Sequence, residues 1–236
     1  MTALELLQRT VRLLGITSPP TSLVGTDDDQ ITNLLEILTD VGQDIASRHD
    51  WSKLAGTFSF VSDGNNSQSA PFASDWSRSF PNASVWRSGS LLVPLSGPCP
   101  PDIWHRLLTL PGIRFPGYWR MFGGEIEIIG VPASETVSVE YVSDAWVIDA
   151  DDGSFKDTVS KDGDTFRIPD RLLRLAVIWQ WRSFKGLSYA EEMSTFEKQL
   201  ERDIAADRSA RPMSTTTPYV PDARNLAWPG LVVVSP

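Results

Sequence analysis

The stretch Ile168–Gly186 has the sequence IPDRLLRLAVIWQWRSFKG and carries apolar residues at helical spacing. Pro169 suits the first helical position, because its fixed φ matches a helix and its missing N–H needs no partner there. Apolar residues surround nearly the whole of this predicted helix, and Gly186 ends it. They are Leu172, Leu175, Ile178, Trp179 and Trp181. A helix that is apolar all round belongs at the centre of a core, so the fold has to be built around this segment.

Three further segments predict amphipathic helices that could cover it. At the N-terminus, Thr2 and Glu5 form a capping box and Gly15 provides the stop. A second helix is expected to open at Thr26, beside an acidic first turn, and to end near Arg48. Their apolar stripes are Leu4, Leu7, Val11 and Leu14, then Ile31, Leu34, Leu35, Leu38, Val41 and Ile45.

The third covering helix follows the central one directly. Ser188 and Glu191 form a second capping box. The expected apolar face of this helix consists of Tyr189, Met193, Phe196, Leu200 and Ile204.

Between the two helical pairs, short alternating runs separated by Gly, Pro, Ser and Asn predict strands. Expected strands are Thr57–Val61, Leu91–Leu95, Tyr118–Phe122, Glu125–Ile129 and Thr136–Val142. Gly123-Gly124 is a two-residue hairpin signal between two of them. Asp102 caps a short predicted helix that carries Ile103, Trp104, Leu107 and Leu108.

The sequence therefore predicts an α+β fold. Residues 1–53 and 167–208 are expected to form a four-helix packing unit, and residues 54–166 a β-rich insertion domain. Residues 209–236 contain five prolines and predict an extended C-terminal arm.

Composition excludes several classes of function. The net charge is −9 and the pI is near 4.7, whereas a dedicated nucleic-acid binder needs a basic face. A single cysteine, Cys99, indicates a reducing compartment, and no apolar run is long enough to span a membrane. Glu5, Arg9 and Arg12 interrupt the N-terminal apolar residues, so we expect no secretory signal and an intracellular product.

No catalytic or metal-binding constellation stands out. Two histidines, His49 and His105, and one cysteine make a zinc site improbable. The turn at 149–153 hints at a calcium loop, but its glycine is one position early and no glutamate stands at the twelfth position. No nucleophile elbow or phosphate loop is present in the sequence, and Cys99 lies between two prolines as a packed thiol. We therefore expect no enzyme, cofactor or metal.

One possible base is His49, followed by Asp50 and Trp51. The segment could be a histidine with its orienting carboxylate. We favour the simpler interpretation, a helix end in which His49 lies near the last carbonyls and Trp51 anchors the chain.

Nine tryptophans raise the alternative of a glycan- or receptor-binding module, which would use Trp76, Trp86 or Trp119 in the β-rich domain. Aromatic residues also commonly fill a small core, which is the interpretation we favour for most of them.

Acidic charge is concentrated in two places. Residues 144–164 carry seven acidic and two basic residues, and residues 188–207 carry six acidic and two basic ones. Such faces are usually just solvated. The functional alternative is a negative surface beside DNA, which like charge keeps from adhering.

The C-terminal arm ends in an apolar segment that an extended chain cannot bury on itself. Its candidate partner-contact residues are Trp228, Leu231, Val232, Val233 and Val234. The arm either adds as a strand to the sheet edge of a partner or docks on its own domain. The sequence favours neither.

Several short motifs, in order, carry a resemblance to a known family. They are Leu4–Leu7 (LELL), Arg12–Gly15 (RLLG), Ile45–Trp51 (IASRHDW), Gly123–Ile126 (GGEI), Glu140–Ser143 (EYVS) with Trp146, Ile168–Asp170 (IPD), Trp179–Trp181 (WQW) and Lys185–Glu192 (KGLSYAEE). Residues 1–210 thereby resemble the head-to-tail adaptor (connector) proteins of tailed bacteriophages, of the kind called tail tubular protein A or packaged-DNA stabilisation protein.

The resemblance implies a structural virion protein at the neck, assembled in the host cytoplasm. Such adaptors form a ring of about twelve copies between the portal protein and the tail or nozzle protein. They extend the DNA channel without sequence-specific binding and help to retain and release the genome. A ring also implies that neighbouring subunits cover apolar side chains that one subunit leaves exposed.

Overall fold

The computed structural model describes residues 1–16, 19–65, 67–81, 83–89, 93–109 and 116–207. The chain is α+β, as the sequence predicts, and its contacts divide it into two compact units. We call Met1–Ala55 with residues 142–207 the helical unit, and Gly56–Tyr141 the β unit.

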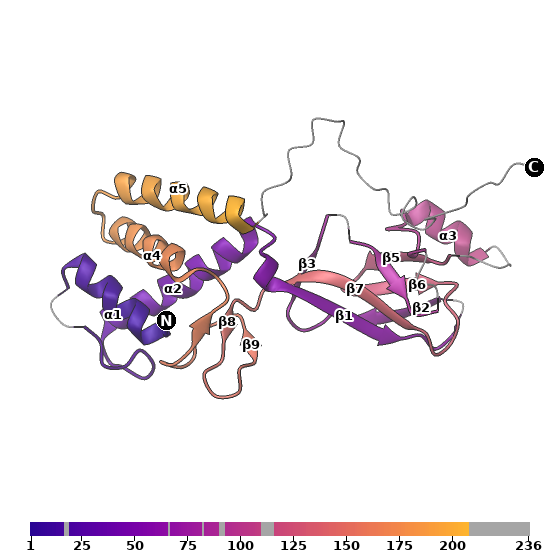
Figure 1. Ribbon diagram of the computed structural model, residues 1–236, viewed down its shortest axis with the longest axis horizontal. Helices are drawn as coiled ribbons and strands as arrows, with labels where there is room; N and C mark the ends of the chain where they lie inside the picture. Colours follow the sequence, from indigo (N-terminus) through magenta and orange to yellow (C-terminus); the bar gives the residue numbers. More distant parts are fainter. Residues whose placement is uncertain (17–18, 66, 82, 90–92, 110–115, 208–236) are drawn as a thin grey trace, which may run out of the picture. The chain divides into compact units, whose positions relative to one another are not determined.

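The helical unit holds four long helices, α1 (Ala3–Leu14), α2 (Asp29–Arg48), α4 (Asp170–Phe184) and α5 (Ala190–Asp207). Helix α4 packs against α1, α2 and α5, which confirms the central position that its sequence predicts (Figure 1). Its buried residues are Leu172, Leu173, Ala176, Val177 and Trp181.

Capping residues define both ends of α1 and the start of α2. The predicted capping box of Thr2 and Glu5 forms, and Gly15 ends α1 at a φ of 73°. Helix α2 begins later than the predicted Thr26, because Asp28 is the residue whose carboxylate accepts the Gln30 N–H. Pro169 is the N-cap of α4 and lies just outside the helix instead of at its first position.

A small three-stranded sheet completes the helical unit. Its strands β8 (Val147–Ile148), β9 (Phe155–Lys156) and β10 (Thr165–Phe166) pair antiparallel in the order β10-β8-β9. Trp146 precedes β8 and is fully buried beside Gly42 of α2. Residues 142–166 therefore cluster with the helices, whereas the sequence boundary placed them with the β-rich domain.

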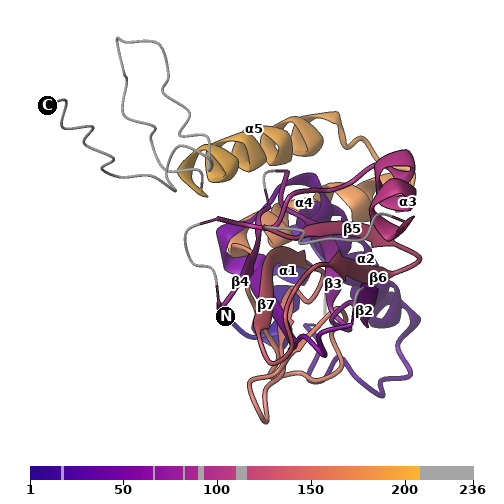
Figure 2. The ribbon, with the colours of Figure 1, turned by 90° about the vertical axis from the view of Figure 1, so that its right-hand side faces the viewer.

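The β unit contains two sheets. One pairs β1 (Ala55–Val61), β7 (Thr136–Ser143) and β3 (Trp76–Ser79) in that order, with β4 (Val85–Arg87) also on β7. The other orders β2 (Ser67–Pro71), β6 (Glu125–Ile129) and β5 (Tyr118–Phe122), as Figure 2 shows. Helix α3 (Pro101–Thr109) is the predicted short helix, but it begins at Pro101, so Asp102 lies in its first turn instead of capping it.

Both sheets contribute to one apolar core. It contains Ala70, Val85, Leu95, Trp119, Ile126, Ile128, Val131, Val137 and Val139. The predicted β5–β6 hairpin forms with both turn glycines, Gly123 and Gly124, at positive φ, as a two-residue turn of this kind requires. The predicted strand at Leu91–Leu95 is absent from its described part, residues 93–95, and Leu91 and Leu92 lie outside the described residues.

Candidate functional site

The turn between α4 and α5 carries a group of exposed apolar side chains. Exposed fractions are 59% for Phe184, 56% for Leu187, and 39% for both Tyr189 and Met193. We call Phe184–Met193 the apolar turn. Four large apolar side chains exposed within ten residues form the kind of patch that marks contact with another macromolecule.

The chain shapes this turn through the end of α4. Gly186 adopts a φ of 67°, and its N–H donates to the Ser183 carbonyl at 3.0 Å. The next amide, that of Leu187, donates to the Arg182 carbonyl at 2.9 Å. These bonds close the helix in the manner of a Schellman motif and direct the chain outward at Leu187.

Side chains beneath the turn hold it in place. Arg182 forms an ion pair with Glu192 at 2.6 Å and donates to the Ser188 carbonyl. The Lys185 ammonium lies 4.6 Å from the ring centre of the buried Trp181. Because the backbone of the turn is already held in position, contact with a partner would cost little backbone entropy.

The sequence placed Tyr189 and Met193 on the buried face of the last helix. The structure buries only Phe196 and Leu200 on α5, and it leaves Tyr189 and Met193 exposed. Helix α4 covers the middle of α5, so the apolar stripe extends past its partner. Periodicity shows that a stripe exists but not where its cover ends, and sequence reasoning therefore missed the apolar turn.

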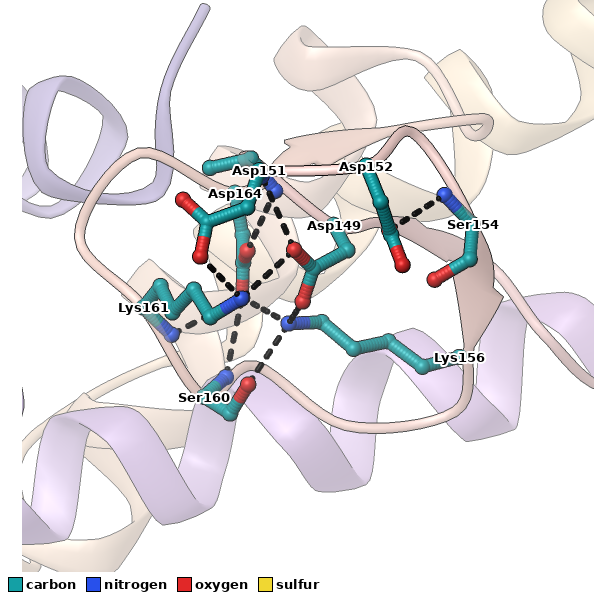
Figure 3. A network of polar contacts seen from close by, with 9 residues as sticks. Asp149, Asp151, Asp152, Ser154, Lys156, Ser160, Lys161 and Asp164 are labelled. Atoms are coloured by element: carbon teal, nitrogen blue, oxygen red, sulfur yellow. Dashed lines mark hydrogen bonds and ion pairs between the residues drawn. The ribbon is translucent and has the colours of Figure 1, made fainter.

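The acidic segment at 144–164 forms a charged network (Figure 3). The Lys156 ammonium lies 2.7 Å from carboxylate oxygens of both Asp149 and Asp164. Lys161 contacts Asp149 and Asp151 at the same distance. The two lysines thus pair with three of the seven carboxylates of the segment, a pairing in space that a count of charges along the sequence did not reveal.

The carboxyl groups of this network are strongly stabilised as anions. Hydrogen bonds from Lys156 and Lys161 hold the pKa of Asp149 far below its usual value. For Asp164, burial favours the neutral form, but Lys156 and the amides of Ser160 and Lys161 outweigh it and lower the pKa. Both groups therefore remain ionised through neutral and mildly acidic pH.

This network supports the start of the first helix. The Asp164 and Asp162 carbonyls accept the N–H groups of Ala3 and Leu4, two amides that a helix start leaves unpaired. The side chain of Asp162 accepts the Leu23 N–H at 2.8 Å. In the described part of the chain, no group of three or more His, Cys, Asp or Glu residues is placed to hold a metal ion.

His49 lies at the end of α2, as its simpler interpretation predicts. Its Nε2 is 3.1 Å from the carboxylate of Asp207, at the end of α5. The Ser52 hydroxyl donates to the same carboxylate at 2.6 Å. The Asp207 carboxylate thus joins the end of α5 to the segment that follows α2. Trp51 anchors the chain, because its buried indole donates to the Ile45 carbonyl at 2.8 Å.

The three tryptophans proposed for glycan binding lie in different surroundings. Trp119 is buried in the core of the β unit. Trp76 is stacked between Phe72 and Tyr141, at ring separations of 4.4 and 4.7 Å. Trp86 lines an open pocket on the sheet. Among these three, Trp86 alone has a platform available to a ligand.

The candidate contact residues of the C-terminal arm, Trp228, Leu231, Val232, Val233 and Val234, lie outside the described residues. Among the helices that the structure describes, none has the length and apolar character needed to cross a membrane.

The two units therefore combine a helical body bearing an apolar turn with a β unit whose tryptophans are mostly packed, an arrangement suited to a protein that contacts other macromolecules. Comparison with protein families then shows which family the chain belongs to. Residues 1–222 match the model of the SU10 adaptor protein family, and the chain belongs to that family. It is thus a phage adaptor-type protein, a component of the virion that interacts with other virion components. Comparison with curated proteins finds no match.

Proposed function

We propose that this chain is a head-to-tail adaptor that assembles as a ring of about twelve copies between the portal protein and the tail or nozzle protein. The ring extends the DNA channel and helps to retain and release the genome, and the chain has no enzymatic activity. The observation that carries the proposal is the adaptor family match over residues 1–222. The net charge of −9 suits a conduit that DNA passes without adhering to it.

The apolar turn supports the ring. Phe184 and Leu187 each expose more than half of their surface, in a turn that closes the packed pair of helices α4 and α5. In the ring, a neighbouring copy covers them, and this burial provides part of the association energy. Each copy contributes one turn and receives another on a different surface, as a closed ring of identical subunits requires.

We assign the C-terminal arm to partner binding in the same assembly. Its apolar end, Trp228 with Leu231–Val234, is the segment that would contact the portal or a neighbouring subunit. An extended segment of this kind binds by adding a strand to the edge of a sheet.

The experiment on the turn mixes the purified chain with the portal protein of the same phage and measures complex mass by size-exclusion chromatography with light scattering. The doubly substituted Phe184→Ser, Leu187→Ser chain should assemble at least about tenfold more weakly, because it lacks two apolar contacts. Phe122→Ser is the matched control, since Phe122 is 63% exposed in the β unit. Equal weakening by both variants would contradict the role of the turn.

Deletion of Ala227–Pro236 tests the arm separately. The truncated chain should keep its fold, measured by circular dichroism, and should lose affinity for the portal protein. Unchanged assembly would contradict the role we give to the arm while leaving the ring itself in place.

A further inference from the structure

An open pocket lies on one face of the β unit. It encloses about 500 Å³ and is lined by Thr57, Phe80, Pro81, Ala83, Ser84, Trp86, Ser138, Val139 and Glu140. The pocket volume falls within the range of about 300–1,000 Å³ that small-ligand sites occupy. We call it the Trp86 pocket.

Strand alternation directs its main side chains away from the core. In β4, Val85 and Arg87 are buried, and Trp86 between them points to the opposite face. Trp86 pairs with Ser138 of β7, which is flanked by the core residues Val137 and Val139. The indole and the serine hydroxyl are therefore neighbours on the outer face of the same sheet.

The remaining lining adds polar groups around the indole. Glu140 follows Ser138 on the same face of β7, and Thr57 is exposed on the neighbouring strand β1. Phe80 and Ser84 contribute a second ring and another hydroxyl from the connection between β3 and β4. The described lining thus combines two aromatic rings, three hydroxyls and one carboxylate, and it contains no Lys, Arg or His.

This composition selects among ligand classes. A phosphate or sulfate group would need cations or converging amides, and Glu140 would repel it. A peptide that binds by strand addition pairs with the edge of a sheet, whereas the Trp86 pocket is lined by side chains on the outer face that β1, β7 and β4 share. A neutral sugar fits better, because its apolar ring face stacks on an aromatic side chain while its hydroxyls bond to polar groups at the rim.

We propose that the Trp86 pocket is a binding site for a neutral oligosaccharide, with one pyranose ring stacked on the Trp86 indole and its hydroxyls bonded to Ser138 and Glu140. This activity is independent of ring assembly. It gives the adaptor a second capacity, the recognition of a carbohydrate surface by the β unit.

The test is an NMR titration of the full-length chain, labelled at its tryptophan indole N–H groups, with maltotriose, cellotriose and triacetylchitotriose. The Trp86 resonance is assigned with the Trp86→Phe variant. At least one trisaccharide should shift it saturably, with a Kd of about 1 mM. No saturable shift with any of the three sugars would overturn the proposal.

Two variants locate the binding. Trp86→Ala should weaken it about tenfold or more, followed through the indole signals that remain or by isothermal calorimetry. Phe122→Ala removes an exposed aromatic side chain elsewhere in the β unit and should leave it unchanged. Equal loss in both variants would overturn the assignment to this pocket. Trp86→Ala should keep wild-type assembly with the portal protein, so failure of the sugar site is distinguishable from failure of the adaptor role.

Discussion

The helical unit and the β unit build their apolar cores from different kinds of contact. The helical unit joins segments from both ends of the described chain, and α4 binds them together. The β unit is one continuous segment, Gly56–Tyr141, whose two sheets share a core. The helical unit therefore depends on distant contacts, such as Trp146 against α2, whereas hairpins such as β5–β6 are encoded locally.

This difference explains what the sequence could predict. The β5–β6 hairpin followed from Gly123-Gly124 and the alternation on either side, because both signals are local. The start of α1 followed from Thr2 and Glu5 for the same reason. The attachment of residues 142–166 to the helices did not, because it rests on one buried indole and on a charged network that closes only in three dimensions.

The candidate surfaces also divide into features that the local sequence predicts and features that depend on a neighbouring element. Periodicity placed Tyr189 and Met193 on an apolar stripe but gave no sign that α4 would leave them uncovered. Among the three tryptophans proposed for glycan binding, sequence alone could not separate the stacked Trp76 and the buried Trp119 from the accessible Trp86. Exposure depends on the partner element, which a single sequence does not show.

The largest expected effect comes from removing Trp146, one of the contacts between distant segments on which the helical unit depends. Trp146→Ala removes a fully buried indole that donates to the Asp157 carbonyl, and it should lower the free energy of unfolding of the helical unit by about 3–5 kcal/mol. Hydrogen exchange should show faster exchange in α1, α2 and α4, with β5 and β6 unchanged. Equal loss of protection in both units would contradict their separate packing.

The next effect concerns the charged network. Asp164→Asn should destabilise the helical unit by about 2–3 kcal/mol at pH 7, because Lys156 loses one of its two carboxylate partners and the Ser160 and Lys161 amides lose a charged acceptor. Asp152→Asn, in the same loop but exposed, is the matched control. Urea unfolding followed by circular dichroism measures both. A loss no greater than that of the control would contradict a structural role for the network.

The same network predicts a pH dependence. The lowered pKa values of Asp149 and Asp164 stabilise the helical unit above the unfolded carboxyl pKa of about 4, and this contribution disappears as the pH falls through the folded values. The urea midpoint of the helical unit should therefore fall between pH 5 and pH 3, and Asp164→Asn should flatten that fall. A wild-type midpoint that stays constant over this range would contradict the assignment.

The smallest expected stability change tests the contact between α2 and Trp146. A Cβ at Gly42 would overlap the Trp146 ring, so Gly42→Ala should cost about 1–2 kcal/mol despite the better helix propensity of alanine. Adding Trp146→Phe should recover part of the loss, because the smaller ring leaves room for the methyl group. Thermal unfolding of the single and double variants measures this coupling, and purely additive losses would contradict the contact.

The adaptor role itself is tested most directly by negative-stain imaging of the purified chain with the portal protein of the same phage, compared with each protein alone. The account predicts a ring docked coaxially on the portal, with the symmetry visible in end-on views. A chain that stays monomeric and never binds the portal would contradict it.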